Sequence, residues 1–129
     1  MSYQYKANFT TAFSLNASTT ATNGVEFTST AISVPYSVIS AVLLATFTRA
    51  AGSASLTVDF YVQVSPDNGT TWYTYTSLAV TTGETVVSGT TVNYAFPINL
   101  AGVTHIRLWK VVNNDTANNL TAVNAGIAF

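Results

Sequence analysis

The feature that most restricts the fold is an alternation of side chains that ends in a compact turn motif. Residues 56–64 read Leu-Thr-Val-Asp-Phe-Tyr-Val-Gln-Val. Because successive side chains of a β-strand point to opposite faces, the even-numbered residues of this segment share one face. These are Leu56, Val58, Phe60, Val62 and Val64. Such a uniformly apolar face has to be buried, so the segment predicts a half-buried strand.

The strand leads directly into Ser-Pro-Asp-Asn-Gly-Thr-Thr-Trp at residues 65–72. Pro66 fixes φ, Asp67 can accept hydrogen bonds from N–H groups that a bend leaves unpaired, and Gly69 can adopt a positive φ. The pattern resembles the Asp-box hairpin of sialidases and many unrelated β-proteins, and its positions are Ser65, Asp67, Gly69, Thr71 and Trp72. In Asp-box proteins the carboxylate lies away from the active site. The resemblance therefore implies a structural hairpin, and one box alone does not indicate a sialidase.

Length and composition indicate one domain with no metal or disulfide framework. The chain has 129 residues and no cysteine, which excludes disulfides and the usual tetrahedral zinc ligand sets. The first residues lack the charged start and apolar run of a secretory signal, so we expect synthesis in a host cytoplasm. The longest apolar run, 41–45, is too short for a membrane-spanning helix.

The charge content is unusually low, at 7% against roughly a quarter in ordinary soluble domains. Threonine, serine and asparagine occupy the positions that lysine and glutamate would normally hold. The permanent cations are only Lys6, Arg49, Arg107 and Lys110. Nucleic-acid binding requires a basic patch, so this composition predicts no nucleic-acid partner.

Residues 1–23 are rich in threonine, serine, asparagine and alanine, with isolated large side chains. We expect an extended N-terminal arm that precedes a single domain at 24–129. The odd-numbered Tyr3, Tyr5, Phe9 and Phe13 would lie on one side of an extended chain and could dock on a neighbour. The alternative is that the segment forms a first strand of the same domain, followed by a loose loop.

The apolar run 38–49 precedes the Leu56 strand, and the segment 50–53 between them has the length of a hairpin loop. A hairpin would place Phe47 opposite Leu56 and Leu43 opposite Phe60, alternating large and small residues across the pair. The opposite face would carry Val42 and Leu44 beside Asp59 and Tyr61. That face is more apolar than a solvated surface requires, which indicates a covered surface.

Further strands are expected at 92–98, stopped near Pro97, at 104–112 and at 120–129. In the second of these, Ile106, Leu108 and Val112 would share one face. The total is about eight strands with frequent turns and no helical periodicity. The sequence therefore predicts an all-β fold, an antiparallel β-sandwich that is jelly-roll-like.

The ionisable residues do not indicate a catalytic set. The carboxylates are Glu26, Asp59, Asp67, Glu84 and Asp115. Asp67 is accounted for by the hairpin and Asp115 by a turn, so only Asp59 and Glu26 could form a glycosidase pair. His105 is the only histidine, which leaves a carboxylate-only calcium site as the remaining metal option. We expect no catalysis, no cofactor and no metal, and a structural ion pair of Asp59 with Arg49 or Arg107.

Residues 56–73 resemble a strand and hairpin that recur in small virion proteins of tailed bacteriophages. The resemblance implies a capsid decoration, or cement, protein that binds the major capsid protein lattice on the outside of the head. Such proteins are often small, β-rich and trimeric, so it also implies a homo-oligomer, with no nucleic-acid or membrane partner. The alternative is a tail or fibre component, or a carbohydrate-binding β-sandwich module. The candidate interface residues are Tyr3, Tyr5, Phe9, Phe13, Val42, Leu44 and Tyr61.

Overall fold

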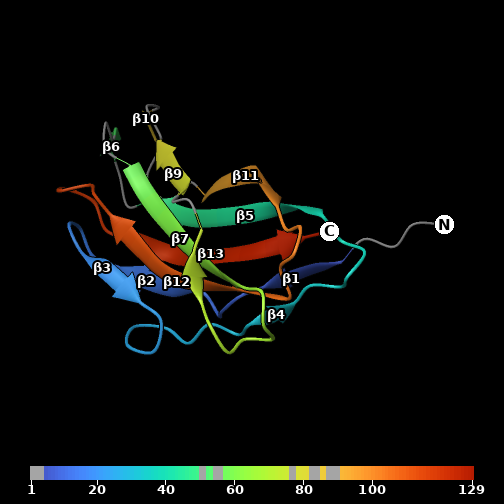
Figure 1. Cartoon of the computed structure of the whole chain (residues 1–129). Coiled ribbons are helices and arrows are strands. Elements are labelled where there is room, and N and C mark those ends of the chain that lie inside the picture. The colour runs from blue at the N-terminus through green and yellow to red at the C-terminus, as the bar shows by residue number, and fades with distance from the viewer. Residues whose placement is uncertain (1–4, 50–51, 54–56, 76–77, 82–84, 87–90) are drawn as a thin grey trace.

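The computed structural model describes residues 5–49, 52–53, 57–75, 78–81, 85–86 and 91–129. Two antiparallel sheets pack face to face (Figure 1). One sheet has the order β1-β13-β5-β11, with β2 also paired to β13. The other has the order β3-β12-β7-β8, with β4 on β12 and β9 on β7, and β6 and β10 form a separate ribbon. The predicted all-β antiparallel sandwich is confirmed.

The described residues contain thirteen strands rather than about eight, because many are only two to four residues long. They are β1 (Lys6–Asn8), β2 (Phe13–Leu15), β3 (Thr20–Thr22), β4 (Ile32–Ser33), β5 (Ser40–Arg49), β6 (Gly52–Ser53), β7 (Thr57–Ser65), β8 (Tyr73–Thr74), β9 (Leu78–Thr81), β10 (Thr85–Val86), β11 (Thr91–Asn99), β12 (His105–Asn113) and β13 (Leu120–Ala128). No helix in this part of the chain is long and apolar enough to cross a membrane.

The core lies between the inner faces of β5 and β7. The even-numbered residues Val58, Phe60 and Val62 of β7 are fully buried, as the alternation predicts. In β5 the alternate residues Ala41, Leu43, Ala45 and Phe47 are buried as well. The rings of Phe47 and Phe60 stack across the sandwich with their centroids 6.4 Å apart. Burial of a large apolar side chain contributes about 1.5–3 kcal/mol, so these two faces supply much of the stabilisation.

The predicted β5–β7 hairpin is wrong. β5 pairs with β11 and β13, whereas β7 pairs with β12, β8 and β9, so the two strands belong to different sheets. The in-register neighbour of Phe47 is Val92, and that of Phe60 is Val111. The proposed loop residues 50–51 and Leu56 lie outside the described residues. Two strands with the same alternation can pair within one sheet, or they can lie in two sheets whose apolar faces pack together. The alternation alone does not distinguish these arrangements.

The segment before residue 24 takes part in both sheets. β1 and β2 pair with β13, and β3 pairs with β12. Phe9 is fully buried in the common core. β1 approaches β13 very closely at Gly126, where a Cβ atom would lie 2.5 Å from the Ala7 carbonyl oxygen. The described residues 5–22 of the predicted arm thus lie in the same two sheets as later parts of the chain.

β11 runs through Pro97 to Asn99 instead of stopping at the proline. β11 is the edge strand of its sheet, and proline is tolerated at an edge because its missing N–H is not needed there. The last strand lies at Leu120–Ala128, within the predicted range.

The expected ion pairs of Asp59 are not formed. Arg49 is fully buried at the end of β5, and its Nε lies 3.4 Å from Oδ2 of Asp115. Burial acts to raise the pKa of Asp115. Hydrogen bonds from the N–H groups of Ala117 and Asn118 and from the Asn118 side chain, together with the charge of Arg49, outweigh it and hold that pKa below its ordinary value. The turn that contains Asp115 is thereby tied to the core.

We expect Asp115→Asn to destabilise the fold by about 1–3 kcal/mol, because it removes the negative charge beside Arg49 and weakens the hydrogen bonds that the Asp115 carboxylate accepts from the N–H groups of Ala117 and Asn118. Urea unfolding of the wild type and the variant measures the loss. The matched control is Glu26→Gln, which removes an exposed carboxylate and should change stability far less. Since the folded-state pKa of Asp115 is lowered, its contribution is present above the unfolded pKa and is lost as the pH falls through the folded pKa. Equal effects of the two substitutions would contradict a stabilising role of the pair.

Candidate functional site

The turn at 65–72 is built by side chains that bond to the backbone. The Ser65 hydroxyl donates to Oδ1 of Asp67 at 2.8 Å and accepts the N–H of Gly69 at 2.8 Å. Oδ1 of Asp67 also accepts the N–H of Thr71 at 2.8 Å. Asn68 and Gly69 adopt positive φ values of 59° and 84°, which these two residue types tolerate. The motif therefore forms a hydrogen-bonded turn, and the carboxylate is used to hold the chain.

The turn positions Trp72 against β12. The guanidinium of Arg107 lies over the Trp72 ring, 4.1 Å from its centroid. Nε and Nη2 of Arg107 both donate to Oε1 of Gln63 on β7, at 3.0 and 2.8 Å. Burial lowers the pKa of Arg107 from its ordinary value, yet arginine stays charged at neutral pH. The guanidinium is thus fixed by two hydrogen bonds to the Gln63 amide and by its position over the Trp72 ring.

A β-bulge in β12 changes which residues point outward. The pairing of β12 with β7 shifts between Leu108 and Lys110, so two consecutive residues, Trp109 and Lys110, avoid the core. Ile106, Leu108 and Val111 are fully buried. The prediction that Val112 shares the face of Ile106 and Leu108 is therefore wrong, because the extra residue moves Val111 into the core. Arg107, Trp109 and Lys110 all remain on the outer side.

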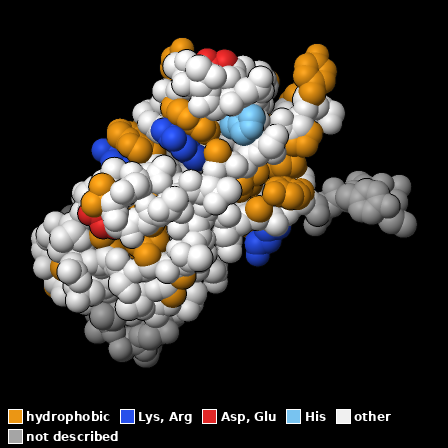
Figure 2. All heavy atoms as spheres, turned by 90° about the horizontal axis from the view of Figure 1, so that it is seen from below, with side chains coloured by type: hydrophobic (Ala, Val, Ile, Leu, Met, Phe, Trp, Pro, Cys, Tyr) orange, Lys and Arg blue, Asp and Glu red, His pale blue; other side chains and the backbone are white. Residues whose placement is uncertain are grey.

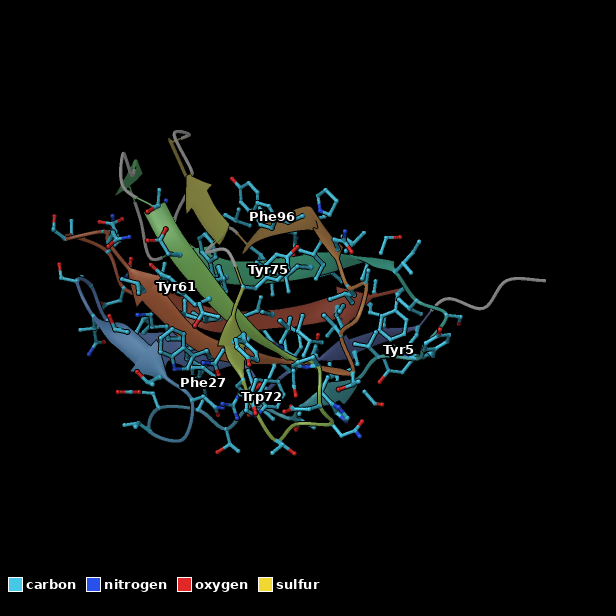
Figure 3. All side chains as sticks on the ribbon, viewed as in Figure 1. Tyr5, Phe27, Tyr61, Trp72, Tyr75 and Phe96 are labelled. Atoms are coloured by element: carbon cyan, nitrogen blue, oxygen red, sulfur yellow. The ribbon has the colours of Figure 1, made fainter. Side chains whose placement is uncertain are left out.

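The ammonium of Lys110 lies over two rings, 4.5 Å from the centroid of Tyr61 and 4.6 Å from that of Trp109. The two rings meet edge to face at 6.2 Å. We call this outer surface of the β12–β7 sheet the aromatic–cation face, made up of Tyr61, Gln63, Trp72, Arg107, Trp109 and Lys110. Figure 3 labels Tyr61 and Trp72 along this sheet, and Figure 2 shows Lys and Arg side chains set among hydrophobic ones.

A second surface gathers apolar side chains near the point where β1 begins and β13 ends. Tyr5 is 47% exposed and its ring stacks on that of Phe129, with the centroids 5.0 Å apart. Tyr5, Val42 and Phe129 line a cavity of about 300 Å³, and Tyr5 and Phe129 also border an adjoining one with Pro35 and Val38. We call Tyr5, Pro35, Val38, Val42 and Phe129 the terminal patch.

The predicted interface residues do not form one surface. Only Tyr5 and Val42 come together, in the terminal patch. Phe13 stacks on Phe27 at 4.7 Å, and Leu44 lines a different cavity, which also contains Tyr94. Tyr61 lies on the other sheet, in the aromatic–cation face. Phe9 is buried inside its own domain and cannot contact a partner, and Tyr3 lies outside the described residues.

The ionisable groups of the described residues are dispersed. Oε2 of Glu26 accepts the N–H of Thr22, and Oδ2 of Asp59 accepts the Asn114 side-chain amide at 2.9 Å. Nδ1 of His105 lies 3.2 Å from the hydroxyl of Thr104, the residue before β12. No group of three or more potential metal ligands occurs in this part of the chain, and Glu84 lies outside it. Glu26 and Asp59 thus each accept a hydrogen bond of the fold, although Oδ1 of Asp59 is buried without a hydrogen-bond partner among the described residues.

Sequence reasoning missed Arg107, Trp109, Lys110 and Phe129 as surface-forming residues. The available signal was the pair Trp109–Lys110, which interrupts the alternation of β12. Two large residues in succession that are unsuited to a core indicate a bulge.

Comparison with known proteins identifies the fold. No family profile and no curated protein sequence matches the chain. The structure resembles that of the VP2 subviral particle of infectious bursal disease virus, with a TM-score of 0.54 at 13% identity, over 98% of this chain and 32% of that chain. T=1 particles derived from the same virus give a TM-score of 0.52 at 13% identity, over 98% and 31%. The T13 viral particle gives 0.52 at 12% identity, over 98% and 31%. The chain thus spans about a third of the length of these proteins and shares a β-sandwich fold with part of them.

We expect Asp67→Ala to lower the melting temperature, because the N–H of Thr71 and the hydroxyl of Ser65 lose their acceptor. The backbone hydrogen bond from Thr71, together with bonds from the Thr71 and Ser65 side chains, lowers the pKa of Asp67. The stabilisation should therefore be present above the unfolded pKa and disappear as the pH falls through the folded one. Thermal melts from neutral to acid pH measure both effects. An unchanged melting temperature with a lost binding activity would show that the carboxylate is functional.

Proposed function

We propose that this chain is a structural virion protein of a bacteriophage that decorates and stabilises the exterior of the capsid through protein–protein contacts. The observation that carries the proposal is the likeness of the whole sandwich to a part of viral particle proteins. The resemblance of residues 56–73 to small phage virion proteins supports the same class. In this proposal the protein is made in the host cytoplasm and acts on the capsid surface.

The proposed partner is the major capsid protein lattice, and the proposed contact is the terminal patch. Val42 is 36% exposed and lines a mainly apolar cavity beside the half-exposed Tyr5, with Lys6 as the one charged residue among the described residues of the lining. Burial of this surface would stabilise a complex without the need for charge, which the composition supplies sparingly. We further propose a homo-oligomer, with a trimer favoured, because many identical weak contacts on a lattice strengthen one another.

If apolar contacts dominate, binding to purified, expanded phage heads should persist at high salt, because screening weakens exposed charges and leaves apolar burial unaffected. Co-sedimentation at low and high salt measures the binding, and light scattering gives the mass of the free protein. A strictly monomeric protein that does not sediment with heads would contradict the proposal. So would release from the heads by moderate salt.

Val42→Lys should reduce binding to heads at least tenfold, because it places a charge in the apolar contact. The matched control is Val25→Lys, at a valine that is 78% exposed and lies in a turn after β3. Both substitutions add the same charge, so only the position differs. If both variants bind heads equally well, the terminal patch is not the contact.

We propose that the chain is not an enzyme. Asp59 and Glu26 each hold a hydrogen bond of the fold, and neither is an evident general acid or base. We expect no turnover of sialosides or other glycosides by the purified protein. Turnover that disappears in Asp59→Asn, with folding intact by circular dichroism, would overturn this view.

A further inference from the structure

We propose that the aromatic–cation face binds an anionic polysaccharide, a sugar chain that carries carboxylate or sulfate groups. The inference goes beyond the decoration role and uses the sheet that does not carry the terminal patch. It depends on the positions of Arg107 and Lys110, which the bulge in β12 brings to the same outer surface.

The first argument concerns which residues gather on this face. Both tryptophans of the chain and two of its four cations lie here. The core, in contrast, is built from phenylalanine, leucine, isoleucine, valine and alanine. Tryptophan and arginine are enriched where proteins bind partners, and a concentration of scarce residue types on a solvent-facing surface calls for a partner outside the fold.

The second argument concerns charge. Arg107 and Lys110 are held by rings and by the Gln63 amide, not by acidic side chains. Within the described residues the ion pair formed is that of Arg49 with Asp115, so neither cation on this face is neutralised by a carboxylate. Cation–π contacts restrict the movement of the two cations but leave their charge available. Arg107 and Lys110 can therefore both bind an anion at this face.

The third argument concerns the kind of polymer that would carry the anion. The surroundings of the two cations carry amide and hydroxyl groups, from Gln63, Tyr61, and the neighbouring Thr22 and Thr74. Amides and hydroxyls both donate and accept hydrogen bonds, as sugar hydroxyls do. The apolar C–H surface of a pyranose packs on the face of an aromatic ring, and Tyr61, Trp72 and Trp109 supply rings on this side of the sheet. A row of such groups along an open sheet surface fits an extended polymer.

Affinity electrophoresis of the full chain in gels that contain polygalacturonate, heparin, dextran or poly-L-glutamate tests the proposal. We expect retardation by polygalacturonate or heparin, weakened by added salt, and none by neutral dextran. The comparison of polygalacturonate with heparin distinguishes carboxylate from sulfate as the anion. Equal retardation by poly-L-glutamate would replace the sugar chain by an acidic protein, and no retardation by either polysaccharide would overturn the proposal.

Variants then locate the site. Lys110→Gln should weaken polysaccharide binding about tenfold or more, since a charge-assisted contact is lost, and Lys110→Arg should retain it. Lys6→Gln is the matched control, because it removes the same charge from β1 on the other sheet. If Lys6→Gln weakens binding as much as Lys110→Gln, the attraction is nonspecific and the proposed site is wrong. Binding to phage heads is measured separately, so either proposal can fail without the other.

Discussion

Burial of the inner faces of β5 and β7 against each other is the interaction on which the other strands depend. Phe47 and Phe60 meet in the middle of the sandwich, and neither strand can leave its sheet without exposing a row of apolar side chains. Within their own sheets, β5 lies between β13 and β11, and β7 lies beside β12. The backs of the two sheets then become separate outer surfaces, one bordering the terminal patch and the other carrying the aromatic–cation face.

Local features of this fold were predictable from the sequence, and long-range ones were not. The turn at 65–72 could be predicted because the bonds among Ser65, Asp67, Gly69 and Thr71 join residues at most four positions apart. The bond from the N–H of Asn68 to the Thr104 hydroxyl joins distant segments and was not predicted. The buried faces of β5 and β7 followed from alternation. The strands that pair with them could not be derived in this way. An apolar face shows that a strand is half-buried, but it does not show whether another apolar strand lies beside it in the same sheet or opposite it in the second sheet. The Arg49–Asp115 pair also spans distant segments and was missed for this reason.

The candidate surfaces show the same division. Tyr5 was predicted as a docking residue of an extended arm and Val42 as part of a face too apolar for solvent, but their neighbour Phe129 comes from the far end of the sequence. Arg107 and Lys110 are three positions apart, a spacing that places side chains on opposite faces of a regular strand. Only the bulge at Trp109 brings them to one face. A single irregular residue thus determines whether that surface exists.

The pairing of β1 with β13 has a consequence for how the chain folds. Lys6 lies opposite Ala128, and the N–H of Phe129 donates to the carbonyl of Tyr5. During synthesis β1 therefore lacks its pairing partner until residues 120–128 have left the ribosome. A sheet closed by its most distant segments folds slowly and exposes an unpaired edge in the meantime. Tyr5 and Phe9 flank β1, so during this interval two large apolar side chains lack the partners that β13 supplies in the folded protein.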